Sequence, residues 1–134
     1  MILSIILVIL SGICKAVADT IKHHYDTSIF KDKKGGFWLS DGSNKYKNGD
    51  SAQGRKYAAM FDGFTDAWHV FNNSAFYLLI VAIGFAYTDS FMILGNLWLL
   101  RAALVTTAGI TLHMQTFNIF YNRILRKKPP TFKP

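Results

Sequence analysis

The sequence contains a single cysteine, Cys14, and no glutamate, so its eight acidic residues are all aspartate. One cysteine cannot form an intramolecular disulfide, so the cysteine content does not indicate whether the protein's compartment is oxidising or reducing. The chain also lacks internal repeats, and no stretch matches a zinc-protease motif of the type His-Glu-x-x-His. These absences exclude a disulfide framework and a repeat architecture.

The composition favours a membrane over water as the solvent of this chain. Over 134 residues, 51% are hydrophobic and the net charge is +7, a combination too apolar for an ordinary soluble domain. Positive charge beside apolar runs is more often a topology signal than a nucleic-acid site. We therefore expect membrane lipids as partners and no nucleic acid.

Three hydrophobic segments predict an all-α membrane protein with three transmembrane helices in one membrane domain, residues 1–134. We place the helices at about 2–26, 57–87 and 90–125, the loop at 27–55 and the tail at 126–134. The second apolar run, residues 75–87, is too short to span about 30 Å of hydrocarbon. Its helix must therefore extend backward through Trp68, which brings polar residues into the span.

The distribution of basic residues predicts the orientation. The segment from Lys22 to Lys56 and the chain from Arg123 onward carry thirteen Lys and Arg residues, whereas the hairpin between the second and third helices and the N-terminus carry none. They are Lys22, Lys31, Lys33, Lys34, Lys45, Lys47, Arg55, Lys56, Arg123, Arg126, Lys127, Lys128 and Lys133. Because basic loops stay in the cytoplasm, the N-terminus is expected outside and the C-terminus inside, in the inner (cytoplasmic) membrane as a multi-pass protein.

An alternative for the first segment is a cleaved signal peptide, because Ala16-Val17-Ala18 after an apolar stretch fits a signal-peptidase site. No positive charge precedes that stretch, however, and Lys15 lies directly before the site. Cleavage would also send the basic loop outward. We therefore expect the first segment to remain as a helix.

The loop is rich in turn dipeptides, namely Gly35-Gly36, Asp41-Gly42 and Asn48-Gly49, and we expect it to form no core of its own. Its aromatic residues, Phe37 and Trp38, stand with Leu39 among lysines. This pattern is typical of a segment that lies at the lipid headgroups.

Polar residues recur at helical spacing in all three predicted helices. The stripes are Ser11, Lys15, Asp19 and His23 in the first helix, Asp62, Asp66, His69 and Asn73 in the second, and Ala102, Thr106, Gly109 and His113 in the third. A rise of about 1.5 Å per residue places Asp19, His69 and His113 at one depth, near the inner interface. We predict that these stripes face one another.

Such a cluster offers ligands for a divalent metal. Imidazole and carboxylate groups suit zinc, manganese or iron, and the candidate ligands are Asp19, His23, Asp66, His69 and His113. Asp62 and Asp66 are the candidate catalytic bases. The alternative is structural: Asp and His near helix ends often act as caps, and Asn72 and Asn73 can hydrogen-bond between helices.

Two cations, Lys15 and Arg101, fall near the middle of their predicted spans. Lys15 can reach Asp19 one turn further on. Both side chains either extend toward the headgroups or receive the anionic group of a substrate or lipid. For Arg101 we expect a cavity that leads to His69 and His113.

Three stretches form a recognisable set: His-His-Tyr-Asp-Thr-Ser-Ile-Phe at 23–30, Asn-Lys-Tyr-Lys-Asn-Gly-Asp at 44–50 and Asp-Ala-Trp-His-Val-Phe at 66–71. Together they resemble an uncharacterised family of small membrane proteins from bacteroidete-type bacteria and their phages. The resemblance covers residues 10–75 and implies a membrane location, but no activity and no catalytic residue. Two of the stretches contain the candidate ligands His23, Asp66 and His69.

Two functional hypotheses follow. The first is a metal-dependent hydrolase or phosphotransferase that acts on a lipid or amphipathic substrate from the inner leaflet, with Lys15 or Arg101 balancing phosphate charge. The second is a non-enzymatic homo-oligomer, such as a phage or host accessory protein or a pore, that associates through Asn72, Asn73 and the small residues of the third helix.

Overall fold

Three long helices form the body of the protein in the computed structural model, which describes residues 1–39, 44–91 and 96–127. They are α1 (Ile2–His24), α3 (Ala67–Asp89) and α5 (Trp98–Ile119), and η5 (Phe120–Ile124) continues α5 with π-helical hydrogen bonds. Shorter helices lie in the connection between α1 and α3: η1 (Tyr25–Thr27), α2 (Gly36–Leu39), η2 (Lys47–Gly49), η3 (Ser51–Gln53) and η4 (Ala59–Phe64). The described residues form no strand, which confirms the predicted all-α class.

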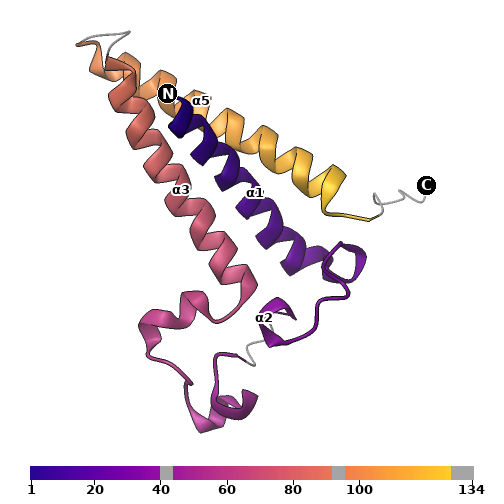
Figure 1. The fold of residues 1–134 in the computed structure, drawn as a ribbon. Helices are drawn as coiled ribbons and strands as arrows, with labels where there is room; N and C mark the ends of the chain where they lie inside the picture. Colours follow the sequence, from indigo (N-terminus) through magenta and orange to yellow (C-terminus); the bar gives the residue numbers. More distant parts are fainter. Residues whose placement is uncertain (40–43, 92–95, 128–134) are drawn as a thin grey trace.

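α1 lies between α3 and α5, and the three helices diverge from the end at which the N-terminus lies (Figure 1). α1 makes most of its contacts with α3, fewer with α5, and α3 and α5 touch least. Ser11 of α1 bonds to Ala75 of α3 and lies beside His113 of α5. Together with the Met1–Asp89 contact, these pairs make α1 antiparallel to α3 and parallel to α5.

Gly12 allows the close approach of α1 and α5. A Cβ at this position would stand 2.8 Å from the carbonyl oxygen of His113 and 2.8 Å from Cβ of Thr116. Because neither distance is compatible with a side chain, glycine is required where these two helices cross.

The second long helix begins at Ala67, and the prediction that it starts near Tyr57 is wrong. Asp66 has an extended backbone, with φ −144° and ψ 161°, and its side chain accepts a hydrogen bond from the backbone N–H of His69. An aspartate in this role is a strong N-cap and fixes the helix start. Residues 59–64 form the separate 3-10 helix η4 instead.

α5 begins at Trp98, later than the predicted residue 90. Its N-cap, Leu97, has non-helical backbone angles, and Ser90 is the C-cap of α3. The helix starts eight residues later than expected, or about 12 Å at 1.5 Å per residue. Each residue of α5, including His113, therefore lies about 12 Å less far along the helix than predicted.

The connection between α1 and α3 packs against the long helices through Phe37 and Trp38. Trp38 stacks on Phe30 with ring centroids 5.5 Å apart and lies 6.5 Å from the Phe71 ring. Both Phe37 and Trp38 contact a buried cluster formed by Ala16, Val17, Ile21, Phe30, Ala67 and Leu125. The loop thus contributes to a core at the divergent end of the helices, while Leu39 stays half-exposed.

Two helical segments in the described residues have the length and apolar composition needed to cross a membrane. They are Ile2–Thr27, which contains α1 and η1, and α3, Ala67–Asp89. α5 is not one of them, because Arg101, His113, Gln115 and Asn118 interrupt its apolar sequence.

Candidate functional site

Lys15 connects α1 to α3 through its ammonium group. Nζ donates hydrogen bonds to Oδ1 of Asp19 at 2.7 Å and to Oδ1 of Asn72 at 3.2 Å. The pairing of Lys15 with Asp19, one helical turn away, confirms the prediction. An ammonium group has three donors, and these two bonds use two of them.

His113 joins the same polar region from α5. Oγ of Ser11 donates a hydrogen bond to the carbonyl oxygen of Ala75 at 2.6 Å and lies 3.0 Å from Nδ1 of His113. Since the Ser11 hydroxyl has one proton and gives it to Ala75, Nδ1 of His113 must be the donor in the second bond. In a neutral ring, Nε2 is then left as an acceptor.

A groove of about 300 Å³ lies beside these bonds, between α3 and α5. Its lining residues are Lys15, Asn72, Asn73, Ala75, Phe76, Tyr77, Leu79 and His113. They supply an ammonium, two carboxamides and an imidazole, next to an apolar wall. We call this site the polar groove. Donors beside apolar surface suit an amphiphile that carries an anionic oxygen group.

Asp66 and His69 form a close pair at the start of α3. Oδ1 of Asp66 accepts from the backbone N–H of His69 at 3.0 Å, and Oδ2 lies 2.7 Å from Nδ1 of the same residue. The carboxylate is almost fully buried. Both carboxylate oxygens thus contact His69 at the helix start, as expected of an aspartate that caps a helix.

The other predicted ligands lie apart from this pair. Asp19 is bonded to Lys15, His113 to Ser11, and His23 is exposed. Asp62 belongs to η4, but its side chain is outside the described part of the structure. Among the described residues, no three His, Cys, Asp or Glu side chains come together in a group that could hold a metal ion.

Arg101 lies at the opposite end of the molecule from His69, in the second turn of α5. Its Nη2 donates to the carbonyl oxygen of Tyr87 at 2.6 Å, and its Nε donates to Oγ of Ser90 at 3.2 Å. The guanidinium also stacks over the rings of Tyr87 and Phe91. Arg101 therefore caps the end of α3. This position is far from His69, so Arg101 does not line a cavity that leads to His69 and His113, as the sequence had predicted.

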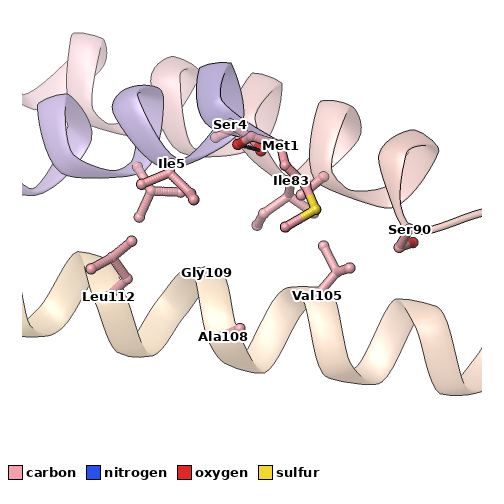
Figure 2. A pocket seen from close by; sticks show the side chains of 12 residues that line it. Met1, Ser4, Ile5, Ile83, Ser90, Val105, Ala108, Gly109 and Leu112 are labelled. Carbon is pink, nitrogen blue, oxygen red and sulfur yellow. Dashed lines mark hydrogen bonds between the residues drawn. The ribbon is translucent and has the colours of Figure 1, made fainter. Parts of the chain in front are cut away.

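A second cavity, of about 250 Å³, lies near this end, between all three helices (Figure 2). We call it the apolar cavity. Figure 2 shows Ile5, Ile83, Val105 and Leu112 pointing into it, and its polar side chains are those of Ser4 and Ser90. None of the predicted site residues lines it.

The sequence indicated part of the polar groove in advance. The four-residue spacing of Ser11, Lys15 and Asp19 identified the face of α1 that meets the other helices. The spacing did not predict the partner of each residue. Lys15 bonds to Asn72, and His113 lies beside Ser11 instead of beside Asp66 and His69. Those pairings depend on the level at which α3 and α5 meet α1.

Comparison with known proteins adds no relative: the chain matches no protein-family model, no curated protein and no solved structure.

Proposed function

We propose that this chain is a three-span protein of the inner membrane that binds the anionic group of a membrane amphiphile in the polar groove. The N-terminus lies outside, and the loop and C-terminus lie in the cytoplasm. α1 and α3 support two of the spans by their length and composition. For the third, the 22 residues of α5 extend about 33 Å, enough to cross the hydrocarbon.

Labelling of single cysteines tests this topology. In a Cys14→Ala background, Ala52→Cys in the loop should react with a membrane-impermeant maleimide only in inverted vesicles. Thr88→Cys at the end of α3 should react only in right-side-out vesicles. Reaction of both cysteines from the same side would exclude three spans.

The polar groove then lies in the inner half of the bilayer. Ser11 is nine residues from the start of α1, about 14 Å, which is close to half of the hydrocarbon thickness. Lys15 is one turn further toward the cytoplasm. A carboxylate or phosphate of an inner-leaflet amphiphile reaches this level when its apolar chain lies along Phe76 and Leu79 of α3.

The observation that supports binding is the Lys15 ammonium in the groove wall, with a third donor beyond its bonds to Asp19 and Asn72. An unpaired lysine inside a bilayer costs about 2.5–3.5 kcal/mol, so its partners matter. Asp19 already offsets the charge, and an incoming anion competes with this carboxylate. Removal of the competitor should therefore strengthen binding.

Native mass spectrometry of the detergent-purified protein tests this proposal, with phosphatidylglycerol and a long-chain fatty acid as separate probes and phosphatidylcholine as the reference. We expect the wild type to retain one of the two anionic probes. Lys15→Gln should lose it, and Asp19→Asn should bind it more tightly.

Lys22→Gln is the matched control, because it removes the same charge from a residue on α1 that does not line the groove. Equal losses in Lys15→Gln and Lys22→Gln would mean that anions bind the basic surface in general and would overturn the proposal. The probe that is retained distinguishes a phosphate from a carboxylate ligand.

A divalent metal, zinc, manganese or iron, on His69 is a second candidate. A histidine whose Nδ1 pairs with a carboxylate, as His69 does with Asp66, is oriented in the way seen in many metal sites, where Nε2 binds the metal. Asp62 is the proposed further ligand, and it would also be the base of a hydrolase or phosphotransferase. Metal analysis tests the idea: His69→Ala should lose a bound metal that His24→Ala retains, and a metal-free wild type would exclude it.

A further inference from the structure

The face of α5 that points away from α1 and α3 carries a stripe of polar residues. Its members are Thr107, Thr111, Gln115 and Asn118 of α5 and Asn122 of η5, spaced by three or four residues and all exposed. Thr116, a buried residue of α5 that lies beside Gly12 of α1, is on the other side of the helix. We call this set the α5 stripe.

The contact between Ser11 and His113 fixes the level of the α5 stripe relative to α1. If α1 spans the membrane as proposed above, His113 lies near the bilayer middle. Gln115 is then about 3 Å further in and Asn118 about 8 Å, so both lie within the hydrocarbon region. This step rests on the proposed three-span topology.

Carboxamides at that level need hydrogen-bond partners, because lipid chains offer none. The threonine hydroxyls can bond to carbonyls of their own helix. Gln115 and Asn118 each carry two donors and an acceptor, and within the described residues neither side chain has a hydrogen-bond partner. A single copy in a bilayer therefore leaves these groups unsatisfied.

We propose that the α5 stripe is the contact surface for a second copy of this chain. Both copies have the same orientation in the membrane, so their α5 helices run parallel around a two-fold axis, and equivalent residues face each other. A carboxamide is self-complementary, since one amide can donate to the other. Toward the outer end, Ala103, Thr107 and Thr111 repeat a small residue every four positions, which lets two helices approach closely.

The width of the α5 stripe favours a dimer seam over the wall of a water-filled pore. Met114 and Ile119 flank it on its two sides, and both apolar side chains are about half-exposed, at 48% and 47%. Lipid suits these neighbours, whereas a pore lumen would place them in water. The surface is also distinct from the polar groove, which lies between α3 and α5.

Disulfide cross-linking in native membranes tests the proposal, in a Cys14→Ala background. Thr111→Cys should form cross-linked dimers on oxidation. Thr106→Cys is the matched control, because Thr106 is also an exposed threonine of α5 but lies outside the stripe. Equal cross-linking of the two variants, or a ladder of higher oligomers from Thr111→Cys, would overturn the dimer.

The affinity of the dimer in detergent tests the proposal without introduced cysteines. Interhelical hydrogen bonds are individually weak, so Gln115→Leu with Asn118→Leu should reduce the dimer affinity about tenfold in detergent titrations. Met114→Leu should leave the affinity unchanged. An unaffected affinity in the double variant contradicts the proposal, and the vesicle labelling of Ala52→Cys and Thr88→Cys separates that outcome from a failure of the three-span topology.

Discussion

The polar groove and the apolar cavity are built from the same three helices, yet their walls differ. The polar groove presents Lys15, Asn72 and His113, whereas the apolar cavity is lined mainly by aliphatic side chains such as Val8 and Val105. The difference follows α1, which is apolar before Ser11 apart from Ser4 and carries a polar residue every fourth position from there on. A change of pattern along one helix thus gives the two ends of one bundle different ligand chemistry.

Gly12 lies between the two sites, and its substitution should have the largest effect. In Gly12→Ala the new methyl group overlaps His113 and Thr116, so α5 must move away from α1. We expect a loss of about 3 kcal/mol, the upper end for overpacking, because one obstacle is backbone. Thermal unfolding in detergent measures it.

Gly84→Ala is the control for Gly12→Ala. Gly84 is a helical glycine of α3 with open space around it. Alanine should stabilise the protein there by up to about 1 kcal/mol through its higher helix propensity. Equal destabilisation by the two substitutions would mean that the α1–α5 crossing does not depend on Gly12.

Arg101 caps the end of α3, whereas Lys15 lines the polar groove. Arg101→Leu removes the charged hydrogen bonds to Tyr87 and Ser90 and should cost about 1.5–3 kcal/mol. Retention of the anionic probe should not change. A loss of probe with unchanged stability would instead place the anion site at Arg101.

A smaller effect is expected at the start of α3. Asp66→Ala removes the N-cap and should cost about 1 kcal/mol in unfolding measurements, while Asp66→Asn, which keeps an acceptor for the His69 N–H, should cost less. The polar groove begins less than two turns from this cap, so anion binding should weaken with it. Equal stability of the two variants would contradict the capping role.

Much of the helical body was predictable from sequence, because it depends on local pattern. The bounds of α1 and the backward extension of α3 through Trp68 follow from apolar length, and the bond from Lys15 to Asp19 follows from helical spacing. The start of α3 was misplaced because the spacing of Asp62 and Asp66 also fits a helix. The N-cap at Asp66 ends that pattern.

The depth of His113 was misjudged for a physical reason. A helix from residue 90 predicts His113 at the depth of His69, whereas α5 begins at Trp98, so His113 lies beside Ser11 and not beside Asp66 and His69. The crossing level of two helices depends on packing around Gly12, and a single sequence contains no direct measure of it.

The most direct test of the central contrast is the accessibility of the two sites to an anionic thiol reagent applied from the cytoplasmic side, again in a Cys14→Ala background. Asn73→Cys in the polar groove should react, and an excess of the retained anionic amphiphile should slow the reaction. Ile83→Cys in the apolar cavity should stay unmodified. Equal rates at the two cysteines, or a rate at Asn73→Cys that the amphiphile does not change, would contradict an anion-binding groove in the inner half of the bundle.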